Sequence, residues 1–168
     1  SLPPTVSGLI LHIASTVWLV ALMIRALKQS GRLNSAGAWH LVSSYMWIIA
    51  PIMMAPFILL GVFEAGPIES TAPQALIYGW VLQFGIALVR YIARRFFLKD
   101  ENPQLGGSWV SLVGATVGSL FVWASIFIVP ARGVLYGIGF ALYAIALIYP
   151  VKELFEIARD GLNKHELA

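Results

Sequence analysis

The chain has 168 residues, of which 59% are apolar and 11% charged, and its formal net charge is +3. Soluble domains carry roughly 25% charged residues, so this composition excludes an ordinary soluble domain and indicates an integral membrane protein. The sequence contains no cysteine, which excludes disulfides, thiol nucleophiles and thiolate metal sites. No basic and aromatic surface pattern is present, so nucleic acid is not an expected partner.

Five apolar segments follow one another along the chain. A bilayer core about 30 Å thick needs roughly 20 mainly apolar residues per helix. The segments that meet this requirement are residues 5–27, 36–63, 74–97, 108–129 and 131–150, the last with a helical extension to about residue 160. Polar, glycine-rich and proline-rich breaks separate them. The sequence therefore predicts an all-α fold, a polytopic transmembrane helix bundle that forms one domain over residues 1–168.

The lysines and arginines gather at one set of segment ends. Ten of the eleven follow the first, third or fifth segment, and only Arg132 lies on the other side. Such residues favour the cytoplasmic side when they lie in short loops. The pattern predicts an outer N-terminus and a cytoplasmic C-terminus, as in a bacterial inner membrane. A first helix that enters from outside is natural if an odd number of helices precedes it, as in the C-terminal part of a longer polytopic chain.

The first and second segments each contain one histidine. At 1.5 Å per residue, His12 lies about two turns below the outer surface and His40 about one turn above the inner surface. They therefore cannot ligate one haem together. Each can serve singly as a ligand to haem b or a contact to quinone, or can hydrogen-bond a group on a neighbouring helix. The spacing of His40, Ser43, Ser44 and Trp47 puts all four on one face, which is expected to point into the bundle.

Two prolines interrupt the second segment. Pro51 and Pro56 each remove a backbone donor and clash with the preceding turn, so they predict a kink. A kink can frame a pocket, but packing alone is the favoured interpretation.

The third segment opens with TAPQALIYGW, residues 71–80. The segment follows a pattern in which Thr-His-x-His is followed, after four residues, by Gly. Thr71 and Gly79 stand at the Thr and Gly positions, and Ala72 and Gln74 stand at the two His positions. The segment resembles the tenth helix of catalytic subunits in the haem-copper oxidase superfamily, especially the nitric-oxide-reductase-like and C-type branches. The Gln-Ala-Leu run before Gly79 is also similar to a His-Ala-Leu run in the haem- and copper-containing NnrS family.

This resemblance implies that the chain has the helical fold of the oxidase subunit but lacks its haem ligands. The chain would correspond to the last five helices of a twelve-helix protein, with Ala72 and Gln74 at the positions of the haem-ligand histidines. Alanine cannot ligate iron, and a glutamine amide does not replace imidazole. The resemblance therefore implies that reduction of oxygen or nitric oxide has been lost while the fold is kept as a scaffold.

The fourth and fifth segments carry glycines at helix-packing spacing. Gly114 and Gly118, and Gly133 and Gly137, form two GxxxG patterns, which let helix backbones approach closely. These four glycines predict that the two segments pack tightly within the bundle or against a partner.

The sequence is compatible with three functions. The favoured one is a non-catalytic membrane subunit or scaffold of a respiratory or photosynthetic electron-transfer complex, with other membrane subunits and lipids as partners. The second is a redox or nitric-oxide-related protein that binds haem or quinone through His12 or His40, and the third is a small transporter. No catalytic residue and no metal ligand set is predicted, because the spans hold no carboxylate, no Ser/His/Asp arrangement and no metal-spaced cluster.

Overall fold

The computed structural model describes the backbone of residues 2–166 and the side chains of residues 6–74 and 76–163. Its elements are α1 (Leu2–Gln29), α2 (Ala36–Ile52), α3 (Ala55–Leu59), α4 (Ala65–Leu76), the π-helix η1 (Ile77–Val81), α5 (Leu82–Phe97), α6 (Trp109–Phe127), the 3₁₀ turn η2 (Val129–Ala131) and α7 (Arg132–Glu166). Within the described residues there is no strand, and five helical runs are long and apolar enough to cross a membrane. The all-α expectation with five candidate spans is confirmed.

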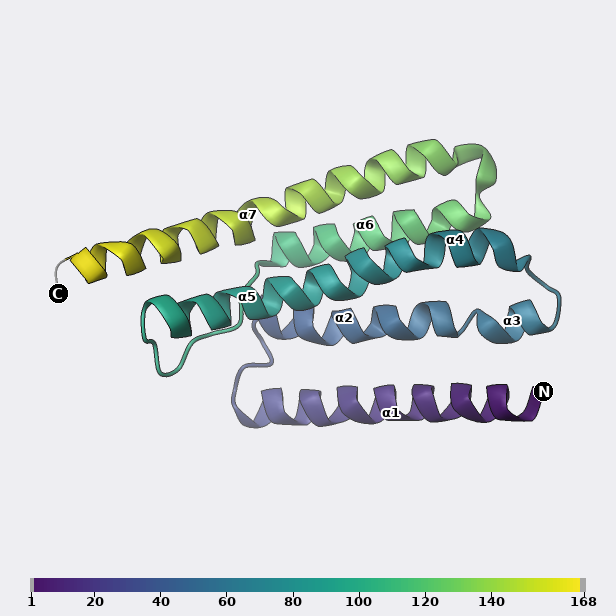
Figure 1. The fold of residues 1–168 in the computed structure, drawn as a ribbon, viewed down its shortest axis with the longest axis horizontal. Coiled ribbons are helices and arrows are strands. Elements are labelled where there is room, and N and C mark those ends of the chain that lie inside the picture. The colour runs from purple at the N-terminus through teal and green to yellow at the C-terminus, as the bar shows by residue number, and fades with distance from the viewer. Residues whose placement is uncertain (1, 167–168) are drawn as a thin grey trace.

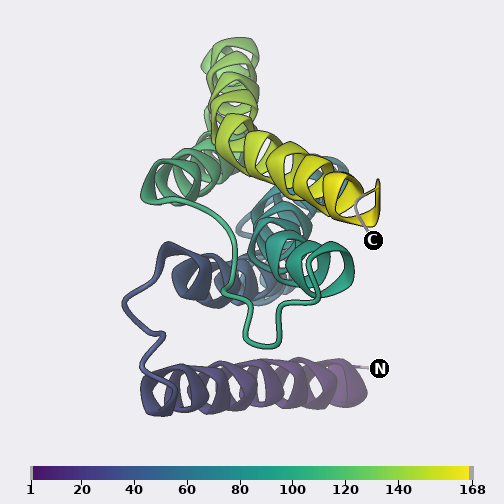
Figure 2. The same ribbon diagram turned by 90° about the vertical axis from the view of Figure 1, so that its left-hand side faces the viewer.

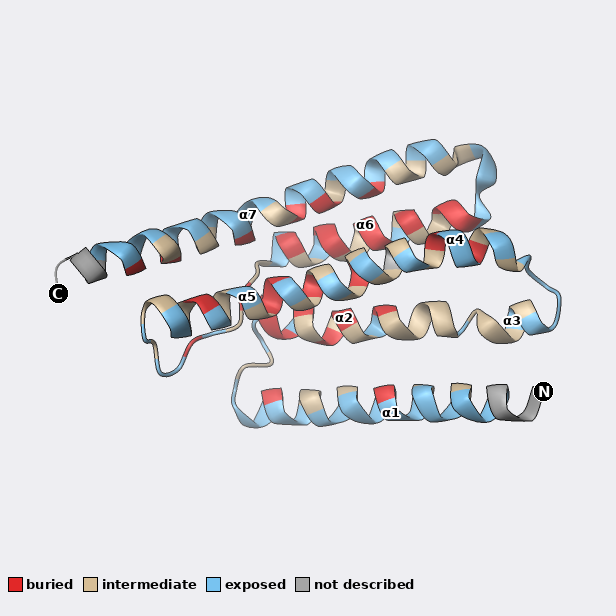
Figure 3. Cartoon of the chain, viewed as in Figure 1, coloured by how far each residue is buried: buried red, intermediate tan, exposed pale blue. Residues whose placement is uncertain are grey.

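The helices lie side by side, with α1 at one edge and α7 at the other (Figures 1 and 2). Buried residues concentrate on α2, α5 and α6 (Figure 3). By contrast, only 6% of the residues in the most apolar 18-residue stretch of α1 are buried, against 44% in the corresponding stretch of α6. The packing of α1 onto the bundle centres on Leu27, which packs with Ala38 and Val42 of α2. The core therefore lies between α2, α5, α6 and α7, and α1 is a peripheral helix.

The third span begins earlier than expected, at Ala65 instead of Gln74. Glu64 is its N-cap and Pro67 lies in the first turn, where a missing backbone donor has no intrahelical acceptor to lose. The prolines of this region therefore do not end the helix, and Pro73 lies inside α4. The wider π-helical turn of η1 follows at Ile77 and leads directly into α5.

The second span is interrupted where the prolines predicted it. α2 ends at Ile52 just after Pro51, and α3 starts at Ala55 with Pro56 in its first turn. Across the break, the Met53 N–H still donates to the Ile49 carbonyl at 2.9 Å. The helical run ends at Leu59, short of the expected residue 63.

The last two spans agree closely with expectation at their starts. Ser108 is the N-cap of α6, and its side chain forms a reciprocal capping box with Ser111. α7 starts at Arg132 and continues as one helix through Pro150 to Glu166, beyond the expected end near residue 160. An internal proline removes one backbone hydrogen bond from a long helix, but the helix can continue past it.

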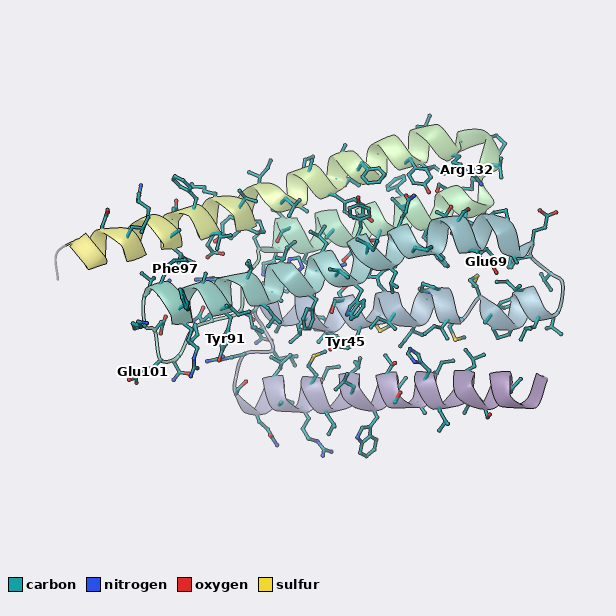
Figure 4. All side chains as sticks on the ribbon, viewed as in Figure 1. Tyr45, Glu69, Tyr91, Phe97, Glu101 and Arg132 are labelled. Atoms are coloured by element: carbon teal, nitrogen blue, oxygen red, sulfur yellow. The ribbon has the colours of Figure 1, made fainter. Side chains whose placement is uncertain are left out.

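One end of the bundle is rich in cations, and we call it the basic end (left in Figure 1). The ends of α1 and α5, the residues that follow them, and the C-terminal part of α7 lie at this end. They carry Arg25, Lys28, Arg32, Arg90, Arg94, Arg95, Lys99, Lys152 and Arg159. Arg132 and Glu69 lie at the opposite end from Phe97 and Glu101 (Figure 4).

The loop between α5 and α6 is fastened at the basic end by arginines. Arg94 Nε is 2.9 Å from Asp100 Oδ2, and the guanidinium lowers the pKa of the Asp100 carboxyl. Arg32 donates to Asn102 Oδ1 at 3.2 Å and to the Pro103 carbonyl at 3.4 Å. The loop thereby joins the end of α1 to the end of α5.

Candidate functional site

His40 is completely buried, and its ring joins α2 to the start of α6. Its Nε2 lies 2.8 Å from Ser111 Oγ. The Ser111 hydroxyl also donates to the Ser108 carbonyl and accepts from the Ser108 N–H, each at 2.8 Å. A serine hydroxyl has one proton and two lone pairs, so Ser111 Oγ can accept a hydrogen bond from His40 Nε2 while it donates to the Ser108 carbonyl. The imidazole is thus part of the N-terminal cap of α6.

The loop before α6 closes over the His40 ring. Gly107 has φ +95°, and a Cβ built there would lie 2.5 Å from Cδ2 and 2.8 Å from Nε2 of His40. Next to it, the Gly106 N–H donates to the Ala87 carbonyl of α5 at 2.9 Å. A glycine backbone therefore covers the Nε2 edge of the ring and leaves no room there for a haem iron or a quinone carbonyl. In this arrangement His40 holds the loop and α6 in place.

His12 is in a different environment. It lies on the exposed surface of α1, where its main-chain carbonyl accepts hydrogen bonds from Ser15 Oγ at 2.9 Å and Thr16 Oγ1 at 2.8 Å. It is fifteen residues before Leu27, around which α1 packs on α2. The structure therefore does not bring His12 and His40 together, and only the His12 imidazole faces outward.

The frame from Thr71 to Gly79 lies on the segment that turns from α4 into η1. Thr71 is buried, while Ala72 and Gln74 are half-buried. A Cβ added to Gly79 would lie 2.6 Å from Cδ2 of Trp47, a ring on α2 that is itself 6% exposed. Gly79 therefore lets an indole lie directly on the π-helical turn. π-helical turns are rare and occur often at functional sites.

Sequence reasoning missed Gln83, one turn beyond Gly79. Its side chain is fully buried in α5, and within the described part of the chain neither amide atom has a hydrogen-bond partner. Nδ1 of His40 also has no hydrogen-bond partner among the described residues. The available signal was the spacing of four from Gly79, which puts Gln83 on the face toward α2.

Two further polar links between helices were also missed. The Tyr143 hydroxyl of α7 donates to Ser119 Oγ of α6 at 3.0 Å, and both side chains are buried. Toward the basic end, Arg90 Nε of α5 lies 3.0 Å from Glu153 Oε1 of α7. These links tie α7 to the bundle, and each joins residues that are distant in sequence.

One of the two predicted glycine pairs lies in the contact between the last two spans, and the other makes no contact within the chain, which leaves its packing against a partner a prediction. Gly114 and Gly118 do lie against α7, and a Cβ at Gly118 would be 2.9 Å from the Gly139 carbonyl oxygen. At Gly133 and Gly137, however, an added Cβ would meet no atom within 4 Å. The contacting glycine of α7 is therefore Gly139, because it is Gly139 that lies on the face of the helix toward α6.

Replacing Gly118 by leucine is expected to destabilise the fold by about 1–3 kcal/mol, the usual cost of overpacking. The new side chain would collide with the Gly139 carbonyl and the ring of Tyr143. Gly137→Leu is the matched control, because it adds the same atoms on the same pair of helices where space is open. Thermal unfolding in detergent measures both, and equal stability of the two variants would contradict the assignment of the interface.

Within the described residues, no group of three or more His, Cys, Asp or Glu side chains is arranged to hold a metal ion. Comparison of the chain with protein-family models, curated proteins and solved structures gave no match. The similarity to the haem-copper oxidase superfamily and to NnrS proteins therefore stays a prediction from the residues of the third span.

Proposed function

We propose that the chain is a non-catalytic membrane subunit or scaffold of a respiratory or photosynthetic electron-transfer complex. The observation that carries the proposal is the environment of His40. Its Nε2 is bonded to Ser111 and the Nε2 edge of its ring is covered by Gly107, so the one buried histidine among the described side chains is closed to a ligand on that edge. Ala72 and Gln74 stand where an oxidase-like helix would carry its haem ligands.

The exposed surface of α1 supports the scaffold role. Leu11 and Trp18 are 70% and 69% exposed, and their spacing of seven puts them on one face of the helix. A peripheral apolar helix of this kind can pack against another membrane subunit without rearranging the core. We infer that this face of α1 is the contact with the rest of the complex.

The proposed orientation follows from the basic end. Cations in short loops favour the cytoplasmic side, so the basic end would face the cytoplasm of a bacterial inner membrane, with the C-terminus inside and the N-terminus outside. Arg132 at the opposite end is the exception, and its Nε donates to the Ser125 carbonyl at 3.4 Å.

A second candidate is haem or quinone binding through His12. The observation that favours it is the exposed position of His12 on α1, where a group held by another subunit could reach the imidazole. His40 offers no such access.

Purification from native membranes in mild detergent tests the proposal. We expect a complex in which co-purifying subunits carry the haem, and we expect Leu11→Ala with Trp18→Ala to release this chain from it. The matched control is Ile148→Ala with Phe155→Ala on α7, which has the same spacing and exposures of 65% and 70%.

Two results would overturn the scaffold role. The first is a stable monomer of this chain alone from native membranes. The second is a stoichiometric b-type haemochrome in the isolated chain that His12→Ala abolishes, which would establish the second candidate instead.

A further inference from the structure

A groove of about 300 Å³ runs between α5 and α7 on the outer surface of the bundle. Every side chain that lines it is apolar, and the lining includes Gly85, Ile86, Val89, Leu147, Pro150 and Leu154. Both helices belong to candidate membrane spans. In a bilayer this groove would face lipid hydrocarbon.

Gly85 lines the groove without contacting another helix. A Cβ built at Gly85 would meet no atom within 4 Å, so this glycine makes no room for a neighbouring helix. In this it differs from Gly79 and Gly118, whose missing side chains are replaced by Trp47 and by the backbone of α7. Glycine in a helix interior lowers helix stability relative to alanine. Packing within the chain does not explain a glycine at position 85, whereas a ligand bound in the groove would explain it.

The groove leads toward the basic end. It shares Leu147 and Val151 with a neighbouring hollow along α7 that is also lined by Lys152. The Lys152 side chain is 73% exposed, and its ammonium lies 3.9 Å from Glu156, at the limit of an ion pair. Beyond Val89 and Leu154, the Arg90–Glu153 pair closes the gap between the two helices. The apolar groove thus lies next to an exposed lysine, whose ion pair with Glu156 is long and exposed to solvent.

We propose that this groove binds one acyl chain of an anionic phospholipid, with its phosphate at Lys152. An unfilled apolar groove forfeits dispersion contacts along its walls, and a flexible hydrocarbon chain restores them. A cation near the membrane surface attracts anionic headgroups over zwitterionic ones. The proposal is independent of the scaffold role, because it rests on α5 and α7 and not on α1.

The test uses delipidated full-length protein in detergent, titrated with phosphatidylglycerol or with phosphatidylcholine of the same acyl chains, and read by native mass spectrometry. Gly85→Leu adds a side chain to the groove lining, where a Cβ meets no atom within 4 Å, and is expected to weaken binding of phosphatidylglycerol at least tenfold. Gly137→Leu, also built into open space, is expected to bind as the wild type does. Lys152→Gln is expected to reduce the preference for phosphatidylglycerol by about fivefold, the effect of one cation at the surface.

Several outcomes overturn the proposal. These are unchanged binding in Gly85→Leu, equal binding of the two lipids by the wild type, or a quinone retained in the groove after delipidation and lost in Gly85→Leu. If Gly85→Leu fails to fold, Leu147→Phe fills the groove from the α7 side and decides the question by the same titration.

Discussion

Replacing Gly107 by alanine is expected to lower the free energy of unfolding by about 2–6 kcal/mol. Two costs add at this position. A φ of +95° strains any residue with a Cβ, and the new Cβ would lie 2.5 Å from Cδ2 of the buried His40 ring. Backbone strain of this kind costs about 1–3 kcal/mol, and overpacking of a buried contact costs a similar amount.

Denaturant or thermal unfolding in detergent micelles measures this loss. Gly133→Ala is the control, because it lies in a helix where the added methyl meets open space, and it is expected to be neutral or stabilising by up to about 1 kcal/mol. If Gly107→Ala were as stable as the wild type, the loop could not be held against His40 as described.

Replacing His40 by alanine is the second large effect, with an expected loss of about 2–5 kcal/mol. The substitution leaves a cavity in the core between α2 and α6 and removes the hydrogen bond to Ser111. Because the loss arises from packing, the absorption spectrum of the purified protein is expected to stay unchanged. A pyridine haemochrome assay on both proteins provides that second readout.

His12→Ala is the matched control for His40→Ala. Its ring lies on the exposed surface of α1, so its effect on stability is expected to stay within about 0.5 kcal/mol. Loss of a b-type haem signal in His40→Ala would show that His40 is a ligand and would contradict its assignment to the α6 cap.

The two variants can be combined in a double-mutant cycle. In a His40→Ala background the ring that clashes with the Gly107 methyl is absent, so Gly107→Ala should cost about 1–3 kcal/mol less than it does alone. Additive losses would mean that the two residues do not touch.

The sequence by itself determined the five long helical runs of this protein and some of their ends. Apolar runs near 20 residues can satisfy their backbone in a bilayer only as helices, and five such runs occur. Local chemistry also predicted the break between α2 and α3, because Pro51 and Pro56 act on their own turns, and it placed the start of α6 at Ser108. These features depend on neighbours along the chain.

Tertiary structure decided how the helices meet. His40 meets Ser111 across 71 residues, Gln83 becomes fully buried, and Gly139 is the glycine of α7 that contacts α6. In a span that is apolar on every side, periodicity does not mark the buried face. Which polar or small residue lies inside then depends on the rotation and depth of each helix against its neighbours, and those are set by packing between distant segments.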